Sequence, residues 1–295
     1  MRQDPEIRLV IVGHFGIAED RTPFGNSLGN GGSGYACAVG AGAGDPRRVG
    51  VVARIGEDFD YDAIVRLGVD TRGAVRVNGG SPRFRITQHS PTQRSFESTL
   101  GVAATPAIDV LPPAYRAARH VHIGTVPIAE QRHWLQMVRD GMPRCAVSVD
   151  MFEATAKESP AECRELAGAA DLVFMNEAER HILYDDHPLP DGEILIKSGE
   201  RGATLRTGGV TIEARTSRYA AVDTTGAGEL LAGAFLSMRV SGVDDRRALR
   251  YAVMIASAKV TEFGLDGPNL RRMIERAHSE TVARTPRDGG PVERV

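Results

Sequence analysis

The sequence predicts an α/β protein in which a doubly wound, mostly parallel sheet carries helices on both faces and a small β-lid. Three observations lead to this prediction. Short apolar strands alternate with helical stretches through the second half of the chain. Glycine and other small residues cluster where strands end. Two groups of short strands, near 16–28 and 73–98, do not fit the alternation and are candidates for the lid.

The first half of the chain opens on a buried strand followed by a glycine-rich stretch. Residues 7–13 are almost entirely apolar, as expected of a strand covered on both faces. Residues 14–30 are polar and lack a helical period, whereas the small residues 31–34 open a helix over 35–43. The elements expected next are a strand at 49–56, a helix near 58–67 and short strands at 73–78, 83–89 and 93–98.

The second half alternates strands with helices. Strands are expected at 120–123, 145–149, 171–175 and 194–197, with helices at 128–140, 160–169 and 176–184. The stretch 203–214 is typical of a hairpin turning at Gly208-Gly209, and helices at 229–240, 245–262 and 268–279 follow. At 295 residues the chain suits one large α/β domain or two small ones; we expect a single domain at 1–280. The Pro/Gly/Arg-rich residues 281–295 are expected to form a disordered tail.

Charge and composition exclude several classes of partner. The formal net charge is −2 and the arginines are scattered, so we expect no nucleic acid partner. No apolar run is long enough to span a bilayer, and the N-terminus lacks the features of a signal peptide. The three cysteines show no metal-ligand spacing and lie in or beside apolar segments, which favours buried free thiols and a cytoplasmic protein.

One heptapeptide carries the strongest indication of chemistry. Asp223-Thr224-Thr225-Gly226-Ala227-Gly228-Glu229 follows a strand-like segment and opens an apolar helical run. Its small residues let backbone N–H groups crowd around an anion, and the helix N-terminus adds partial positive charge. A carboxylate is costly beside a bound phosphate unless it handles a proton or a metal. The pattern therefore indicates phosphoryl transfer to a hydroxyl with Glu229 as base; the alternative is a glycine-rich turn that only caps a helix.

Asn176 and Glu179 form a second candidate motif. They lie three residues apart near the start of a predicted helix and so share one face of it. Two oxygen-bearing side chains at this place suit a hydrated Mg²⁺ bridged to nucleotide phosphates. The same spacing also satisfies a capping box, and the residues alone leave both interpretations open.

A third candidate, Lys197-Ser198-Gly199-Glu200-Arg201-Gly202-Ala203, follows another strand. Its glycines permit close backbone approach to ribose and phosphate. A single Gly-x-x-Gly is weak evidence, because many hairpin turns have it. Its place in the chain, between the other two motifs, gives it weight.

Taken in order, these segments resemble the signature of the PfkB-type carbohydrate kinases, the ribokinase-like family. Residues 223–229 resemble its D-T-x-G-A-G-D signature, and 176–179 its N-x-x-E motif. Residues 197–203 resemble its T-x-G-x-x-G nucleotide loop, with Ser198 standing for Thr. The resemblance extends from about Ile7 to about Ala277, since 31–36 match the N-terminal Gly-Gly motif and 51–58 the next block.

The resemblance implies a ribokinase-like fold and ATP-dependent phosphorylation of a small polyol: a sugar, a cyclitol or a nucleoside. It implies Mg²⁺ held through water by Asn176 and Glu179, a monovalent cation held by carbonyls, and a homodimer. It assigns catalysis to Glu229, Gly226, Ala227 and Gly228, nucleotide binding to Asn176, Glu179, Lys197, Ser198, Gly199, Gly202, Asp223 and Thr225, and substrate binding to Gly31, Gly32, Ala36 and Glu229.

Three positions depart from the family pattern. Glu229 replaces the usual Asp and is longer by one methylene. Ala18 falls where the family has an Asp for substrate hydroxyls, although Glu19 or Asp20 could replace it. Ala36 falls where the family has an Asn, a variant similar to inositol-kinase-like members. An alternative from another class follows: a catalytically degenerate protein that binds nucleotide or sugar as a sensor.

Overall fold

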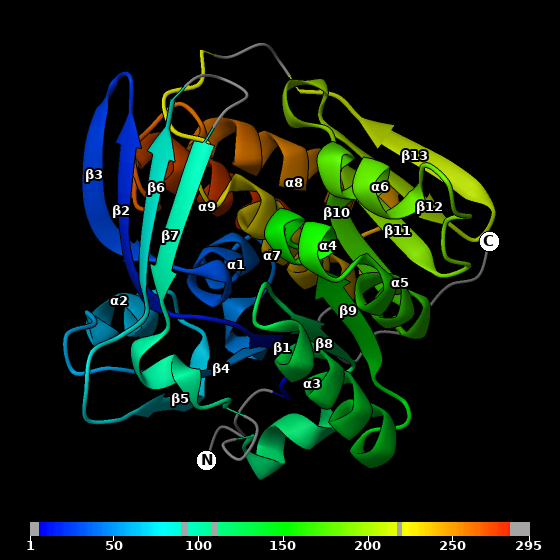
Figure 1. Ribbon diagram of the computed structural model, residues 1–295, viewed down its shortest axis with the longest axis horizontal. Helices are drawn as coiled ribbons and strands as arrows, with labels where there is room; N and C mark the ends of the chain where they lie inside the picture. Colours follow the sequence, from blue (N-terminus) through cyan, green and yellow to red (C-terminus); the bar gives the residue numbers. More distant parts are fainter. Residues whose placement is uncertain (1–5, 90–93, 108–110, 217–219, 284–295) are drawn as a thin grey trace.

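A computed structural model describes residues 6–89, 94–107, 111–216 and 220–283. Its centre is a nine-stranded sheet in the order β13-β12-β11-β10-β9-β8-β1-β4-β5 (Figure 1). All pairs from β5 to β11 are parallel, and β11, β12 and β13 pair antiparallel. The strands are β1 (Leu9–Val12), β4 (Val49–Ile55), β5 (Asp70–Arg76), β8 (His120–Ile123), β9 (Ala146–Asp150), β10 (Leu172–Asn176), β11 (Glu193–Lys197), β12 (Ala203–Thr207) and β13 (Val210–Ala214).

Helices cover both faces of the sheet, as the apolar strands require (Figure 1). Side chains of β1 alternate between the two cores, with Leu9 and Ile11 in one and Val10 and Val12 in the other. One face carries α1 (Ser33–Ala41), α2 (Tyr61–Arg66), α7 (Ala227–Val240), α8 (Asp245–Lys259) and α9 (Pro268–Val282). The other carries α3 (Ile128–Gly141), α4 (Glu153–Glu158), α5 (Pro160–Ala169) and α6 (Glu177–Tyr184). The predicted doubly wound α/β fold is confirmed.

Glycines bring α1 and α7 into close contact. A Cβ at Gly233 would lie 1.9 Å from the Cys37 carbonyl oxygen, and one at Gly40 would lie 2.0 Å from that of Leu230. Only hydrogen fits at these positions, so the two helices approach backbone to backbone. This contact fixes the start of α7 relative to the Gly-Gly segment that precedes α1.

The lid is a separate sheet of four strands in the order β3-β2-β6-β7 (Figure 1). Its strands are β2 (Gly16–Thr22), β3 (Gly25–Gly31), β6 (Arg83–Gln88) and β7 (Arg94–Thr99). The prediction that the lid begins near residue 73 was wrong, because β5 pairs parallel with β4 in the main sheet. A six-residue helix, α2, makes this crossover, and β5 is an edge strand with several partly exposed residues, so its sequence looks like that of a lid strand.

Other differences concern element ends and short elements. Helix α4 and the short 3₁₀ turns η1 (Pro46–Arg48), η2 (Gly101–Ala104), η4 (Pro113–Ala117) and η5 (Gly199–Arg201) were not predicted. Helix α8 ends at Lys259 rather than 262, because the Val260 carbonyl accepts hydrogen bonds from the amides of Val222 and Asp223. Helix α9 continues to Val282, and the rest of the predicted tail, from 284, lies outside the described residues. In the described part of the chain, no helix has the length and apolarity to cross a bilayer.

Candidate active site

The heptapeptide forms the turn that starts α7, as predicted. Gly226 is the N-cap and adopts a left-handed conformation with φ 74°, which favours glycine. A Cβ at Gly226 would lie 3.4 Å from the Cβ of Ala36, so the turn rests on the start of α1. Glu229 is the third residue of α7 and half-buried. The first-turn N–H groups, which have no partner inside a helix, therefore lie beside the carboxylate predicted to be the base.

A buried ion pair holds this turn in place. Lys259 and Asp223 side chains are fully buried, and Lys259 Nζ donates to Asp223 Oδ2 at 2.5 Å and to its carbonyl oxygen at 3.0 Å. The Asp223 carboxylate also accepts from the amides of Thr225 (2.8 Å) and Gly264 (3.2 Å). Asp223 thus shapes the turn, and the role in nucleotide binding assigned to Asp223 and Thr225 stays a prediction.

Carboxylates gather at the edge of the sheet around one lysine. Asp150 ends β9 and is fully buried, and its Oδ1 accepts from Lys197 Nζ at 2.6 Å. Asp150 Oδ2 is buried and has no hydrogen-bond partner among the described residues. Burial raises the pKa of Asp150 to about 6, with Lys197 opposing the shift and Glu229 adding to it. Burial also raises the pKa of Glu179 to about 7, with Lys197 lowering it and Asp150 raising it.

The structure forms the capping box that the spacing of Asn176 and Glu179 allows. The Asn176 side chain accepts from the Glu179 amide at 2.9 Å, and Glu179 Oε2 accepts from the Asn176 amide at 2.7 Å. Within the described ranges no three His, Cys, Asp or Glu side chains converge closely enough to hold a metal. Mg²⁺ usually keeps several waters among its ligands, and its water-mediated binding by Asn176 and Glu179 stays a prediction.

The predicted nucleotide loop lies between β11 and β12, with Gly199 and Gly202 at positive φ of 56° and 100°. A Cβ at Gly202 would lie 2.0 Å from the Ala214 carbonyl oxygen, whereas one at Gly199 would meet nothing within 4 Å. The Ser198 hydroxyl donates to Glu177 at 2.7 Å. The two-residue spacing to Gly199 places Lys197, rather than Ser198, at the Thr position of T-x-G-x-x-G, which corrects the alignment given above.

Aromatic side chains connect the lid to the sheet. His14 stacks on Phe84 of β6 with ring centroids 6.0 Å apart, and Phe84 stacks on Phe96 of β7 at 6.2 Å. Phe96 meets Phe152 edge to face at 5.5 Å, and Phe152 lies two residues beyond Asp150. Phe96 remains 45% exposed, so part of this aromatic row faces solvent.

The Gly-Gly segment, residues 31 and 32, joins lid strand β3 to α1. A Cβ at Gly31 would lie 2.5 Å from that of Ala18, and one at Gly32, where φ is 97°, would lie 2.5 Å from the His14 carbonyl oxygen. Asp20 lies further along β2 and is 5% exposed. Burial and the nearby Asp223 raise the pKa of Asp20, while Thr225 and Ser27 lower it by hydrogen bonding. A buried lid carboxylate therefore lies near the α7 turn, two residues from the position where the family pattern expects it.

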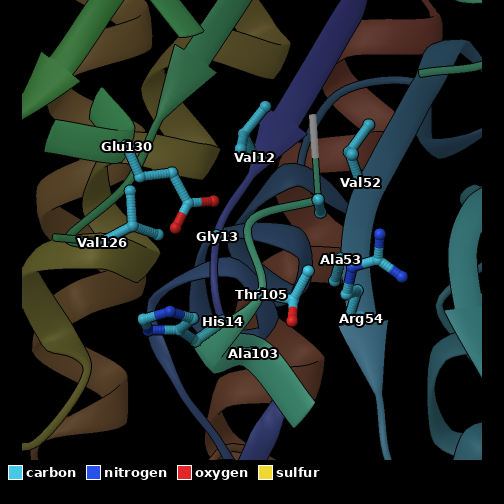
Figure 2. Close-up of a pocket in the computed structure, with 11 residues that line it drawn as sticks. Val12, Gly13, His14, Val52, Ala53, Arg54, Ala103, Thr105, Val126 and Glu130 are labelled. Carbon is cyan, nitrogen blue, oxygen red and sulfur yellow. The ribbon is translucent and has the colours of Figure 1, made fainter. Parts of the chain in front are cut away.

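A small cavity lies at the carboxyl ends of β1 and β4. Figure 2 shows Glu130 and His14 on one side of Gly13 and Arg54 on the other. Burial lowers the pKa of His14 to about 4 and raises that of Glu130. The His14 ring thus stays neutral near pH 7, which suits its contact with the aromatic row.

Reasoning from the sequence missed Asp150, Lys259 and the aromatic row. An Asp at the carboxyl end of a buried parallel strand was the available signal for Asp150. A lysine within an otherwise apolar helix face was the signal for Lys259. No local pattern marks Phe84, Phe96 and Phe152, which come from three different elements.

Comparisons with known proteins show the family and the fold. A family model described as pfkB family carbohydrate kinase matches residues 17–271. A cytidine kinase from Thermococcus kodakarensis is 25% identical over 249 residues, covering 78% of this chain and 87% of that protein. An adenosine kinase from Sinorhizobium meliloti has a TM-score of 0.79 at 16% identity, covering 92% of this chain and 100% of that one. A ribokinase from Cryptococcus neoformans in complex with ADP has a TM-score of 0.74 at 19% identity, covering 92% of this chain and 99% of that one.

Proposed function

We propose that this protein phosphorylates a hydroxyl of a nucleoside or related polyol, with Glu229 as general base. The chain belongs to the pfkB family of carbohydrate kinases and is a small-molecule kinase. The observation that carries the proposal is the position of Glu229 in the first turn of α7. There a carboxylate can take a proton beside N–H groups that stabilise the transferred phosphoryl group.

The nucleotide and its metal would lie over the carboxyl ends of β9, β10 and β11. Ser198, Gly199 and Gly202 would line the nucleotide, and Asn176 with Glu179 would hold Mg²⁺ through water. The buried Oδ2 of Asp150, which has no partner among the described residues, offers a further hydrogen-bond acceptor at this edge of the sheet. Mg²⁺ neutralises charge on the phosphates of the bound nucleotide. Contact between the metal and Glu179 would require its capping bond to the Asn176 amide to loosen.

Aromatic contacts favour a nucleoside among the three acceptor classes. A nucleobase can stack on Phe84, Phe96 or Phe152, whereas a sugar or a cyclitol lacks an aromatic ring. Gly31, Gly32 and Ala36 would line the ribose, and Ala36 lies beside the α7 turn. Relatives named as cytidine kinase and adenosine kinase support the same class.

A non-catalytic binding protein is the second candidate. The replacement of Asp by Glu229 and the alanines at 18 and 36 favour it, since a misplacement of about 1 Å can cost on the order of 10²-fold in rate. The gathering of Asp150, Glu179 and Lys197 beside α7 favours the enzyme, because binding alone does not need three ionisable groups buried together.

We also propose that the chain forms a homodimer through its lid. Phe24 and Leu28, at the β2–β3 hairpin, are 69% and 74% exposed. Covering them would remove apolar surface from water. The monovalent cation site stays a prediction.

The deciding experiment measures ADP release with Mg-ATP and a panel of cytidine, adenosine, ribose, fructose and myo-inositol. We expect turnover with a nucleoside and a loss of about 10²–10⁴-fold in Glu229→Gln, with ATP still raising the melting temperature. Glu162→Gln is the matched control, because Glu162 is also the third residue of a helix and lies at the surface. Equal turnover in Glu229→Gln would refute the base assignment. Thermal stabilisation by ATP without turnover on any acceptor would favour the binding protein.

A further inference from the structure

Lys197 reaches across a neighbouring strand to make its ion pair. It ends β11, whereas Asp150 ends β9, and β10 lies between them with Asn176 in register with Lys197. Strands lie about 4.8 Å apart, so the Lys197 side chain must extend over the end of β10 to reach Asp150. The ammonium therefore lies in the middle of the edge where the acidic side chains gather.

The same ammonium borders the α7 turn. A Cβ at Gly228 would lie 3.3 Å from both Nζ and Cδ of Lys197. Gly228 is the second residue of α7, where N–H groups have no partner inside the helix. Two independent sources of positive charge, an ammonium and a helix N-terminus, thus face one small region.

Lys197 keeps its charge and retains capacity to bind a ligand. Burial alone would lower its pKa, but Asp150, Glu179 and Glu229 raise it above the ordinary value. An ammonium has three donors, and the bond to Asp150 is the one hydrogen bond that the Lys197 side chain makes to the described residues. A further acceptor of high negative charge can therefore bind without displacing Asp150.

We propose that Lys197 is a catalytic residue of this kinase: its ammonium binds a non-bridging oxygen of the transferred phosphoryl group, and Asp150 is the positioning residue that holds it there. The inference rests on the proposed function. In the step, the bond from the γ-phosphorus to the β–γ bridging oxygen breaks and a bond to the acceptor oxygen forms. The acceptor proton passes to Glu229 and ADP leaves. Lys197 stays protonated throughout and offsets the charge that develops on the phosphoryl oxygens and the leaving group.

The experiment compares Lys197→Met, Lys197→Arg and the surface variant Lys157→Met. Loss of one preorganised donor lowers kcat by about 10²–10³-fold, so we expect that loss in Lys197→Met with little change in KM for ATP. Lys197→Arg should recover part of kcat, and Lys157→Met should equal wild type. ADP with aluminium fluoride, a mimic of the transferred phosphoryl group, should raise the melting temperature of wild type more than ADP alone does. Lys197→Met should lose this extra stabilisation.

A double variant separates catalysis from charge balance. Lys197→Met with Asp150→Asn restores neutrality in the core, so it should recover the melting temperature but not kcat or the response to aluminium fluoride. Recovery of the melting temperature, of kcat and of the response to aluminium fluoride in the double variant would overturn the catalytic role of Lys197. A kcat in Lys197→Met within about threefold of wild type would do the same. In both cases the proposed function would stand. Wild-type protein that neither turns over nor responds to ADP with aluminium fluoride would overturn both.

Discussion

Two lysine–aspartate pairs border the α7 turn, one fully buried and one partly buried, and they differ in how completely they are bonded. The chain has 36 Lys and Arg residues, of which only Lys157, Lys197 and Lys259 are lysines. Of these three, Lys259 is fully buried, and the side chain of Lys197 is 14% exposed. Lysine presents a compact ammonium with three donors, whereas arginine presents a planar guanidinium with five.

The pair of Lys259 and Asp223 is the more fully bonded of the two. Asp223 accepts from the ammonium and from two backbone amides, and Lys259 also bonds the Asp223 carbonyl oxygen. The pair of Lys197 and Asp150 makes a single bond and leaves Asp150 Oδ2 without a partner among the described residues. Satisfied bonding is what a structural pair needs, whereas unused bonding capacity beside other carboxylates is what a ligand site offers.

The largest expected effect is on folding, in Lys259→Met. Removing one partner of a buried ion pair leaves an uncompensated charge, so we expect the free energy of unfolding to fall by about 3–5 kcal/mol. Urea unfolding of both single lysine variants measures the difference. The free energy of unfolding should fall less in Lys197→Met, because Asp150 already has a raised pKa and can take up a proton. A larger loss in Lys197→Met would contradict the division into a structural and a functional pair.

The next effect is on the pH dependence of stability. The folded protein holds protons on Asp150 and Glu179 up to pKa values of about 6 and 7, raised mainly by burial. The unfolded chain releases them near pH 4, so the free energy of unfolding should fall as the pH rises from about 4 to about 7. Glu179→Gln keeps the capping geometry and removes one titrating group. The free energy of unfolding at pH 5 and at pH 7.5, measured without Mg²⁺ or nucleotide, should differ less in this variant than in wild type. An unchanged difference would show that Glu179 does not contribute to this pH dependence.

The smallest expected effect on stability comes from Gly228→Ala, which displaces Lys197 without removing its charge. The new Cβ would press on the flexible end of Lys197 at 3.3 Å. Alanine gains about 1 kcal/mol over glycine within a helix, which offsets this contact, so unfolding should change by less than about 1 kcal/mol. Turnover should still fall several-fold, because the ammonium is displaced. Unchanged kcat would show that the ammonium does not need this position.

The sequence by itself determined the fold class and the local motifs. Strand and helix periods predicted most of the parallel sheet, and Gly208-Gly209 predicted the β12–β13 hairpin, where both residues have positive φ. The α7 turn with Gly226 and Glu229 was predicted for the same reason. These features depend on backbone conformation and on spacing within a few residues, which neighbouring residue types largely fix.

Only the tertiary structure decided which distant residues meet. Lys197 and Asp150 are 47 residues apart, and Lys259 and Asp223 are 36 apart. The first pair meets because β9, β10 and β11 are neighbours, and the second because the end of α8 packs against the α7 turn. The assignment of β5 to the main sheet depends in the same way on its pairing with β4. Strand order and helix packing are properties of the whole chain, so no local pattern in the sequence contains them.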